Sequence, residues 1–217
     1  MSAIAEQSIP VVEGASSDRQ AIRDLIESWV IWRDAGDWEK FASVWHDDGR
    51  MVTTWCSVDA AEFVNRCRQS FENGFVSLHT LGGTSLDISG TRAVAQTKMQ
   101  LLMRGAAHGV PLDVICYGRF VDALEKREGR WGIVLRQPVY ELDQVIPHQP
   151  GVPVDFDRDL LATFPEGYRH LGYVQTQMGM TVDRKLPGTR GPEIEQLNRR
   201  MRRWLDGEPR ACLDEEE

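Results

Sequence analysis

Two side chains of this sequence suit proton transfer by their type and position. His79 lies in Ser77-Leu78-His79-Thr80, inside an alternating pattern typical of a strand, and histidine is the usual general base near neutral pH. Asp34 comes four residues after Val30 in an apolar helical repeat, which places its carboxylate near the apolar side of a helix. A desolvated carboxylate becomes more basic unless a partner keeps it charged. Each is therefore a candidate for acid–base chemistry; the alternatives are an exposed Asp34 and a structural, hydrogen-bonded His79.

Arg136 is a third candidate for chemistry. It belongs to the last predicted strand, in phase with Pro138 and Tyr140, and an arginine among apolar neighbours needs an anionic or polar partner. We expect Arg136 or Tyr140 to assist a leaving group or to stabilise an oxyanion. The structural alternative for Arg136 is a buried ion pair, for which Asp34 is one partner to consider.

Other chemical motifs are weak or missing. The sequence has no G-x-S-x-G, G-x-G-x-x-G or P-loop motif, so serine nucleophiles and nucleotide cofactors are disfavoured and we expect no cofactor. His46-Asp47-Asp48 resembles a metal cluster, but adjacent residues in a turn rarely converge on one ion, so we expect no metal. The remaining histidines are expected to have structural roles in turns or linkers: His46, His108, His148 and His170.

The elements that must position these residues follow from the spacing of the apolar residues. A period of 3.6 predicts a helix that starts at Ser16 or Ser17, carries an apolar stripe from Ile22 to Arg33 and ends at Gly36. The next expected elements are a helix at Trp38–Trp45, a turn at 47–49, a strand at Met51–Cys56 and a helix at Val58–Glu72.

After residue 75 the period changes to 2. Four strands are expected, at Val76–Ile88, Ala93–Met103, Pro111–Leu124 and Trp131–Leu142. Gly82-Gly83 is expected to form a bulge that curves the sheet. Helices followed by long strands indicate an α+β fold, in which three helices and a curved antiparallel sheet form a cone around an apolar pocket. The substrate-binding wall of that pocket is expected to include Trp29, Trp32, Met51, Trp55, Phe120 and Tyr140.

The chain is expected to divide into three parts. Residues 1–16 read as a flexible arm, 17–146 as the cone domain and 147–217 as a C-terminal extension. Within the extension, short helices are expected at Asp157–Phe164 and Gly167–Met178. An amphipathic helix is expected at Pro192–Leu205, packed on the domain or on a neighbouring subunit. The extension is a candidate cover for the mouth of the cone, and its candidate lid residues are Tyr168, Tyr173 and Trp204.

Composition excludes several classes of partner. Among 217 residues, 25 are basic and 33 acidic, for a net charge of -8, without the basic stripe of a nucleic-acid binder. No apolar run approaches the ~18–20 residues of a membrane span, and the first 17 residues lack the pattern of a signal peptide. The four cysteines are scattered, which fits a reducing compartment. We expect a cytoplasmic protein with no nucleic-acid or membrane partner.

Several stretches resemble a known family. The segments Ala21 to Leu25, Arg33 to Trp38 and Phe41 to Gly49 are similar to the opening of the SnoaL-like branch of the nuclear-transport-factor-2-like superfamily. Gly118 to Asp122, and Gly129 to Ile133 with Arg136, are similar to its ending. More narrowly, the chain resembles the subgroup of hexachlorocyclohexane dehydrochlorinase and scytalone dehydratase. The resemblance covers about residues 17–146 and implies the cone-shaped α+β fold.

The resemblance also implies roles for individual residues. His79 would abstract a proton, Asp34 would orient and stabilise its imidazolium, and Arg136 would help the leaving group. The chain departs from the dehydrochlorinase at Trp29, where that enzyme has a lysine, which disfavours halide elimination. It also lacks the early tyrosines of scytalone dehydratase, since the first tyrosine is Tyr117.

We therefore expect a cofactor-independent lyase that acts on a small, apolar, aromatic or polycyclic molecule. Dehydration is the first choice, and loss of formaldehyde from a lignin-derived diaryl diol is a variant. The alternatives are a ketosteroid-type isomerase that shuttles a proton and a non-catalytic binding or assembly module. The family resemblance further implies a homo-oligomer, either a trimer or a dimer.

Overall fold

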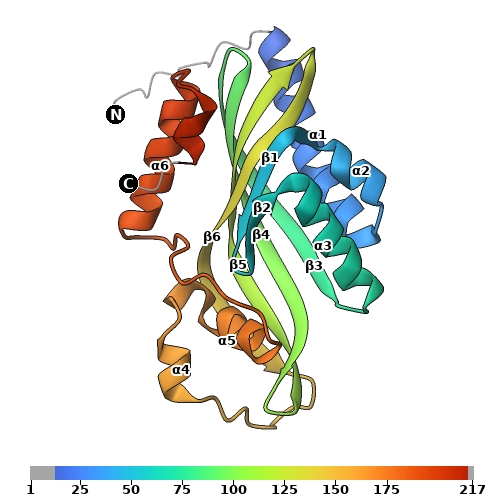
Figure 1. The fold of residues 1–217 in the computed structure, drawn as a ribbon, viewed down its shortest axis with the longest axis vertical. Coiled ribbons are helices and arrows are strands. Elements are labelled where there is room, and N and C mark those ends of the chain that lie inside the picture. Colours follow the sequence, from blue (N-terminus) through green and yellow to red (C-terminus); the bar gives the residue numbers. More distant parts are fainter. Residues whose placement is uncertain (1–12, 215–217) are drawn as a thin grey trace, which may run out of the picture.

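The computed structural model describes residues 13–214 and is built around one curved sheet. Its strands are β1 (Trp45–Thr53), β2 (Cys56–Asp59), β3 (Ser77–Ser89), β4 (Arg92–Ala107), β5 (Val110–Arg127) and β6 (Arg130–Pro147). They lie in the order β2-β1-β6-β5-β4-β3 (Figure 1). The long strands β3 to β6 follow one another in antiparallel hairpins, as the alternating pattern predicts.

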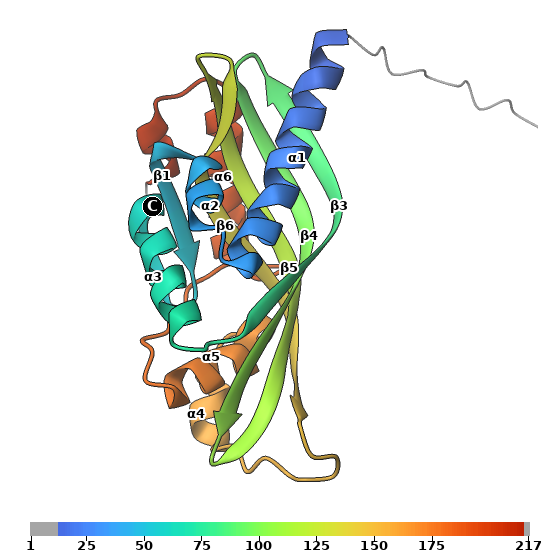
Figure 2. The ribbon, with the colours of Figure 1, turned by 90° about the vertical axis from the view of Figure 1, so that its right-hand side faces the viewer.

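Helices cover both faces of this sheet. Three N-terminal helices, α1 (Glu13–Ala35), α2 (Trp38–Ser43) and α3 (Ala60–Glu72), pack on one face, and α6 (Pro192–Leu205) packs on the other (Figures 1 and 2). The short helices α4 (Arg158–Ala162) and α5 (Arg169–Gln177) lie at one end of the sheet. This confirms the α+β class and the layer of three helices.

The start of the sheet differs from the prediction. β1 pairs in parallel with β6, so the sheet is mixed and not wholly antiparallel. β1 also begins at Trp45 and runs through the predicted turn at 47–49, which is an irregularity in the β1–β6 register. Trp45 and His46 are buried there, and Gly49 approaches backbone oxygens so closely that a Cβ would lie 2.8 Å from His46 O. Burial of these two rings extends the strand across a segment whose residue types favour a turn.

The first helix begins earlier than predicted. α1 starts at Glu13 and not at Ser16 or Ser17. The predicted flexible arm, 1–16, therefore overlaps the helix at 13–16, and its first 12 residues lie outside the described part of the chain. The predicted bulge at Gly82-Gly83 is confirmed, since the β3–β4 register shifts between Leu81 and Thr84.

The amphipathic helix of the extension packs on its own domain. Its buried side chains Leu197, Met201 and Trp204 belong to a second apolar cluster with Val121 and Leu135 of the sheet. The guanidinium of Arg92 stacks 3.9 Å from the centre of the Trp204 ring. α6 therefore packs on the sheet of its own chain, and a contact of α6 with a neighbouring subunit and the predicted homo-oligomer stay predictions. Within residues 13–214, no helix is long and apolar enough to cross a membrane.

Candidate active site

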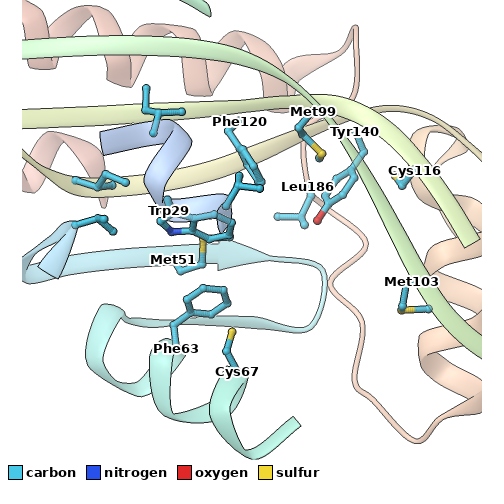
Figure 3. Close-up of a cluster of buried hydrophobic side chains, with 14 of the residues drawn as sticks. Trp29, Met51, Phe63, Cys67, Met99, Met103, Cys116, Phe120, Tyr140 and Leu186 are labelled. Atoms are coloured by element: carbon cyan, nitrogen blue, oxygen red, sulfur yellow. The ribbon is translucent and has the colours of Figure 1, made fainter. Parts of the chain in front are cut away.

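A pocket opens between α1, α3 and the concave face of the sheet. Figure 3 shows Phe63 and Cys67 pointing from α3 toward the sheet, and Phe120 and Tyr140 pointing from the sheet toward α3, with Trp29 at the inner end. The pocket encloses about 740 Å³, counting the part open to solvent, and leaves about 80 Å³ for the centre of a water-sized sphere. A single water needs roughly 10–15 Å³ by the second measure, so the pocket has room for one small organic molecule.

His79 lines this pocket and contacts Asp34, a residue of α1 that does not itself line it. His79 Nδ1 lies 3.0 Å from Asp34 Oδ1, and the backbone N–H of His79 donates to Asp34 Oδ2 at 2.6 Å. The side chains are 9% and 14% exposed for His79 and Asp34. Since Nδ1 is engaged with the carboxylate, Nε2 on the far side of the ring is the atom available to a ligand. The two residues that the sequence singles out are thus in contact, 45 positions apart in the chain.

The backbone explains why the two residues meet. α1 ends in a Schellman motif, in which Gly36 N–H bonds Arg33 O at 3.4 Å and Asp37 N–H bonds Trp32 O at 2.9 Å, with Gly36 at φ +75. This motif fixes the last turn of the helix, including Asp34. β3 is an edge strand, so the outward N–H of His79 has no partner strand and is free to bond the carboxylate.

The electrostatics favour an ionised aspartate and a neutral histidine. Burial lowers the pKa of His79, the charge of Arg33 lowers it further, and these effects outweigh the opposing influence of Asp34. Burial alone would raise the pKa of Asp34, but the hydrogen bond and charge of His79, together with Arg33, hold it below its ordinary value. At neutral pH His79 therefore donates from Nδ1 to Asp34, which leaves Nε2 with a lone pair.

Arg33 is a pocket residue that the sequence interpretation missed. Its Nη1 donates to Asp34 Oδ1 at 2.8 Å and to Ser77 O at 3.1 Å, and the side chain is 14% exposed. The Cys67 sulfur also lies within hydrogen-bonding reach of its guanidinium. The sequence does indicate this position, because Arg33 falls on the apolar stripe of the helix. A charged residue on such a stripe points toward the same space as its apolar neighbours.

Arg136 does not line the pocket. It is fully buried and forms a bidentate ion pair with Asp122, with Nε–Oδ1 at 2.7 Å and Nη2–Oδ2 at 2.8 Å. Its guanidinium also lies 4.5 Å and 4.4 Å from the ring centres of Trp29 and Phe120. The structural alternative of a buried ion pair is therefore the observed one, and the partner is Asp122, not Asp34. Arg136 therefore contacts Trp29 and Phe120, two rings that line the pocket, without lining the pocket itself.

The wall contains five of the six predicted substrate-binding residues. Trp29, Met51, Trp55, Phe120 and Tyr140 line the pocket, whereas Trp32 packs against the core outside it. Trp29 contacts the edge of the His79 ring, with centroids 5.5 Å apart. Burial raises the pKa of Tyr140, so its phenol stays protonated and can donate a hydrogen bond. Burial likewise raises the pKa of Cys67, which disfavours a thiolate.

A comparison with protein families identifies the domain that carries Asp34 and His79. A model of the SnoaL-like domain matches residues 14–137, more than half of the chain. The chain belongs to the SnoaL-like domain family. Asp34, His79 and Arg33 all lie within the matched region.

Sequence relatives of this SnoaL-like protein are fungal. A PEP2-like protein of Fusarium vanettenii (NECHADRAFT_97050) is 35% identical over 202 residues, covering 88% of this chain and 87% of the relative. Pea pathogenicity protein 2 from the same fungus is 34% identical with the same coverage. Because 202 aligned residues exceed the family domain, these relatives share part of the C-terminal extension as well.

Solved structures share the fold. A hexachlorocyclohexane dehydrochlorinase, LinA type 2, superposes with a TM-score of 0.55 at 16% identity, over 65% of this chain and 97% of that one. A Novosphingobium aromaticivorans protein named after scytalone dehydratase gives 0.52 at 15% identity, over 68% and 99%. At these identities the likeness concerns the SnoaL-like fold alone.

The C-terminal extension adds two residues to the pocket of the SnoaL-like domain. Gln175 on α5 and Met180 just after it line the cavity, and neither was predicted. The three candidate lid residues have other roles. Tyr168 is buried with its hydroxyl 3.0 Å from Asp183 O, Tyr173 bonds His108 at 2.5 Å, and Trp204 lies on the opposite face of the sheet.

The other histidines bond to protein groups outside the pocket. His46 Nε2 bonds Glu125 O at 2.8 Å from a buried position in β1, which corrects its predicted place in a turn. His148 bonds Asp113 and His170 bonds Asp143. Among residues 13–214, no three His, Cys, Asp or Glu side chains come close enough together to hold a metal ion.

Proposed function

We propose that this protein is a lyase in which His79 is the general base. The observation that carries the proposal is the contact of Asp34 with His79, whose ring lines an apolar pocket. A neutral imidazole with one nitrogen held by a carboxylate and the other free is the arrangement that general-base catalysis requires. The dehydrochlorinase among the structural neighbours is consistent with an elimination, but it contributes fold evidence only.

The proposed step is the loss of water from a hydroxylated substrate. His79 Nε2 takes a proton from carbon, the C–H electron pair becomes a C=C bond, and the C–O bond on the adjacent carbon breaks. The proton on His79 then passes to the departing hydroxyl, which leaves as water, so the step needs no outside acid or cofactor. Asp34 stabilises the imidazolium between the two transfers, and Tyr140, which lines the pocket, is proposed to donate a hydrogen bond to the substrate oxygen.

The substrate is proposed to be small and to contain a flat ring. Trp29, Phe63 and Phe120 form a cluster of aromatic rings in the pocket wall. The faces and edges of such rings pack well on a flat apolar molecule. The limited free volume favours one or two rings over a larger polycyclic compound.

Mass spectrometry of products tests the proposal. The protein is incubated with a panel of aromatic alcohols and hydroxylated cyclic ketones, and a lyase yields a product lighter by one water. His79→Gln and Asp34→Asn should abolish or strongly reduce this product. His148→Gln, which removes an exposed histidine outside the pocket, should not. A product of unchanged mass would indicate the isomerase, formaldehyde release would indicate the deformylation variant, and full activity in both pocket variants would refute the base.

A further inference from the structure

The pocket wall contains buried polar atoms that have no partner within the protein. Among residues 13–214, four pocket-lining side chains carry such an atom: Trp29 Nε1, Arg33 Nε, Ser77 Oγ and Gln175 Oε1. An unsatisfied buried polar group is costly, and its usual explanation is a ligand or an ordered water. In Figure 3 the Trp29 nitrogen lies on the side of its ring opposite to Tyr140, whereas the other three atoms belong to polar side chains of α1, β3 and α5.

Packing brings Arg33 and Ser77 together and places α5, which carries Gln175, beside the strand that pairs with Ser77. Arg33 Nη1 bonds the backbone oxygen of Ser77 at 3.1 Å, so the guanidinium and the Ser77 hydroxyl are neighbours. Ser77 pairs with Met103 across the β3–β4 ladder. α5 packs beside the next residues of β4, because a Cβ at Gly105 would lie 3.0 Å from Val174, the residue before Gln175.

The three atoms together offer two hydrogen-bond donors and one acceptor to a ligand. Arg33 Nε is a donor on a cation, and the Ser77 hydroxyl can also donate, so together they suit an anionic or carbonyl oxygen. Gln175 Oε1 accepts and therefore suits a hydroxyl hydrogen. Ser77 and Gln175 are 8% and 3% exposed, so water competes poorly for them once a ligand is bound.

We propose that Arg33, Ser77 and Gln175 form a polar recognition site for a flat-ring ligand that carries an anionic or carbonyl oxygen and a separate hydroxyl. Arg33 and Ser77 bind the oxygen, and Gln175 of the C-terminal extension binds the hydroxyl. Gln175 lies beyond the matched family domain, so the extension sets a specificity that the domain alone lacks. This inference rests on the proposed function only in naming the substrate class of the same pocket.

Binding of matched single-ring probes tests the site without any catalysis. Isothermal titration calorimetry at neutral pH and fixed salt compares the hydroxybenzoate isomers with benzoate, which lacks the hydroxyl, and with phenol, which lacks the carboxylate. We expect the best hydroxybenzoate isomer to bind at least about tenfold more tightly than either, because each comparison removes one hydrogen bond to a charged or buried group.

Each variant should remove one preference and keep the other. Arg33→Met should erase the preference over phenol, and Ser77→Ala should weaken it severalfold in case the arginine variant fails to fold. Gln175→Met should erase only the preference over benzoate. Gln177→Met, an exposed glutamine on the same helix, is the matched control and should change nothing.

The outcomes separate this inference from the proposed function. The recognition site would be overturned if the three probe types bound with equal affinity or if none bound. It would also be overturned if Arg33→Met kept the preference over phenol or Gln175→Met kept the preference over benzoate. His79→Gln should keep both preferences, because it removes the base and leaves the three recognition residues in place. If both preferences hold while no compound is turned over, the recognition site stands and the lyase proposal fails.

Discussion

The buried pair Arg136–Asp122 allows a quantitative prediction about stability. Both side chains are fully buried and joined by two hydrogen bonds of 2.7 Å and 2.8 Å, and the guanidinium lies 4.5 Å and 4.4 Å from the centres of the Trp29 and Phe120 rings. Removing one partner leaves the other charge without compensation in the interior, which costs about 3–5 kcal/mol. Asp122→Leu and Arg136→Met should therefore each lower the free energy of unfolding by this amount.

Replacing both partners should be much milder. Apolar residues of similar volume in place of a buried ion pair are often neutral, so Asp122→Leu/Arg136→Met should recover most of the loss of either single variant. Urea denaturation measures the effect. With an m-value of about 2–3 kcal/mol/M, each single variant should shift the midpoint down by about 1–2.5 M.

Breaking an exposed ion pair is the control for breaking the buried one. Lys40→Met breaks the exposed ion pair with Asp37 and should leave the midpoint unchanged. If the single variants lose less than about 1 kcal/mol, or if the double variant loses their sum, the pair is not the isolated buried unit described above. Because Arg136 does not line the pocket, the activity of the double variant should stay within about tenfold of wild type.

Further predictions concern the base, the helix end and the extension. Asp34→Asn should lower kcat by about 10²–10⁴-fold with a small change in KM, because the imidazolium loses its counter-charge; stopped-time assays with the identified substrate measure this. The pKa of His79 lies below the ordinary histidine value of about 6.5, so kcat/KM should stay high at pH 6.5 and fall only as the pH drops through the lowered pKa; a loss that begins above pH 7 would contradict this. The folded protein binds fewer protons there than the unfolded chain, so stability should fall over the same acid range, and His79→Gln should lack that step. Gly36→Ala should cost about 1–2 kcal/mol in thermal unfolding, since φ is +75. Trp204→Ala should cost about 3–5 kcal/mol through the cavity it leaves under α6, with the pocket intact by probe binding.

Features that depend on local periodicity could be predicted from the sequence. The apolar repeat of α1 places Asp34 in its last turn, and the alternation of β3 places His79 on a strand. The amphipathic pattern of Pro192–Leu205 matches α6 at both ends. In each case the period of the backbone fixes which face a side chain occupies, so residue spacing is sufficient.

Features that depend on contacts between distant segments could not be predicted in this way. The partner of Arg136 is Asp122, which lies opposite it in the β5–β6 register only because that register shifts between Ala123 and Leu124. No periodicity reveals such a shift. The parallel pairing of β1 with β6 is likewise a tertiary choice. Gln175 reaches the pocket because α5 packs against β4, β5 and β6, a contact that its own pattern does not encode.

The position of positive charge in the pocket shows how a comparison by position can mislead. Trp29 stands where the resembling dehydrochlorinase has a lysine, and taken alone the exchange removes a cation from the first helix. In the structure Arg33 supplies a cation from the next turn of the same helix, because residues three or four apart share a face. The cation of this pocket, Arg33, therefore lies beside Asp34 and Ser77. Trp29 packs against Arg136, whose own charge is neutralised by Asp122. Of the two arginines near the aromatic wall, Arg33 alone lines the cavity among residues 13–214, so it is the cation that a ligand in this pocket would meet.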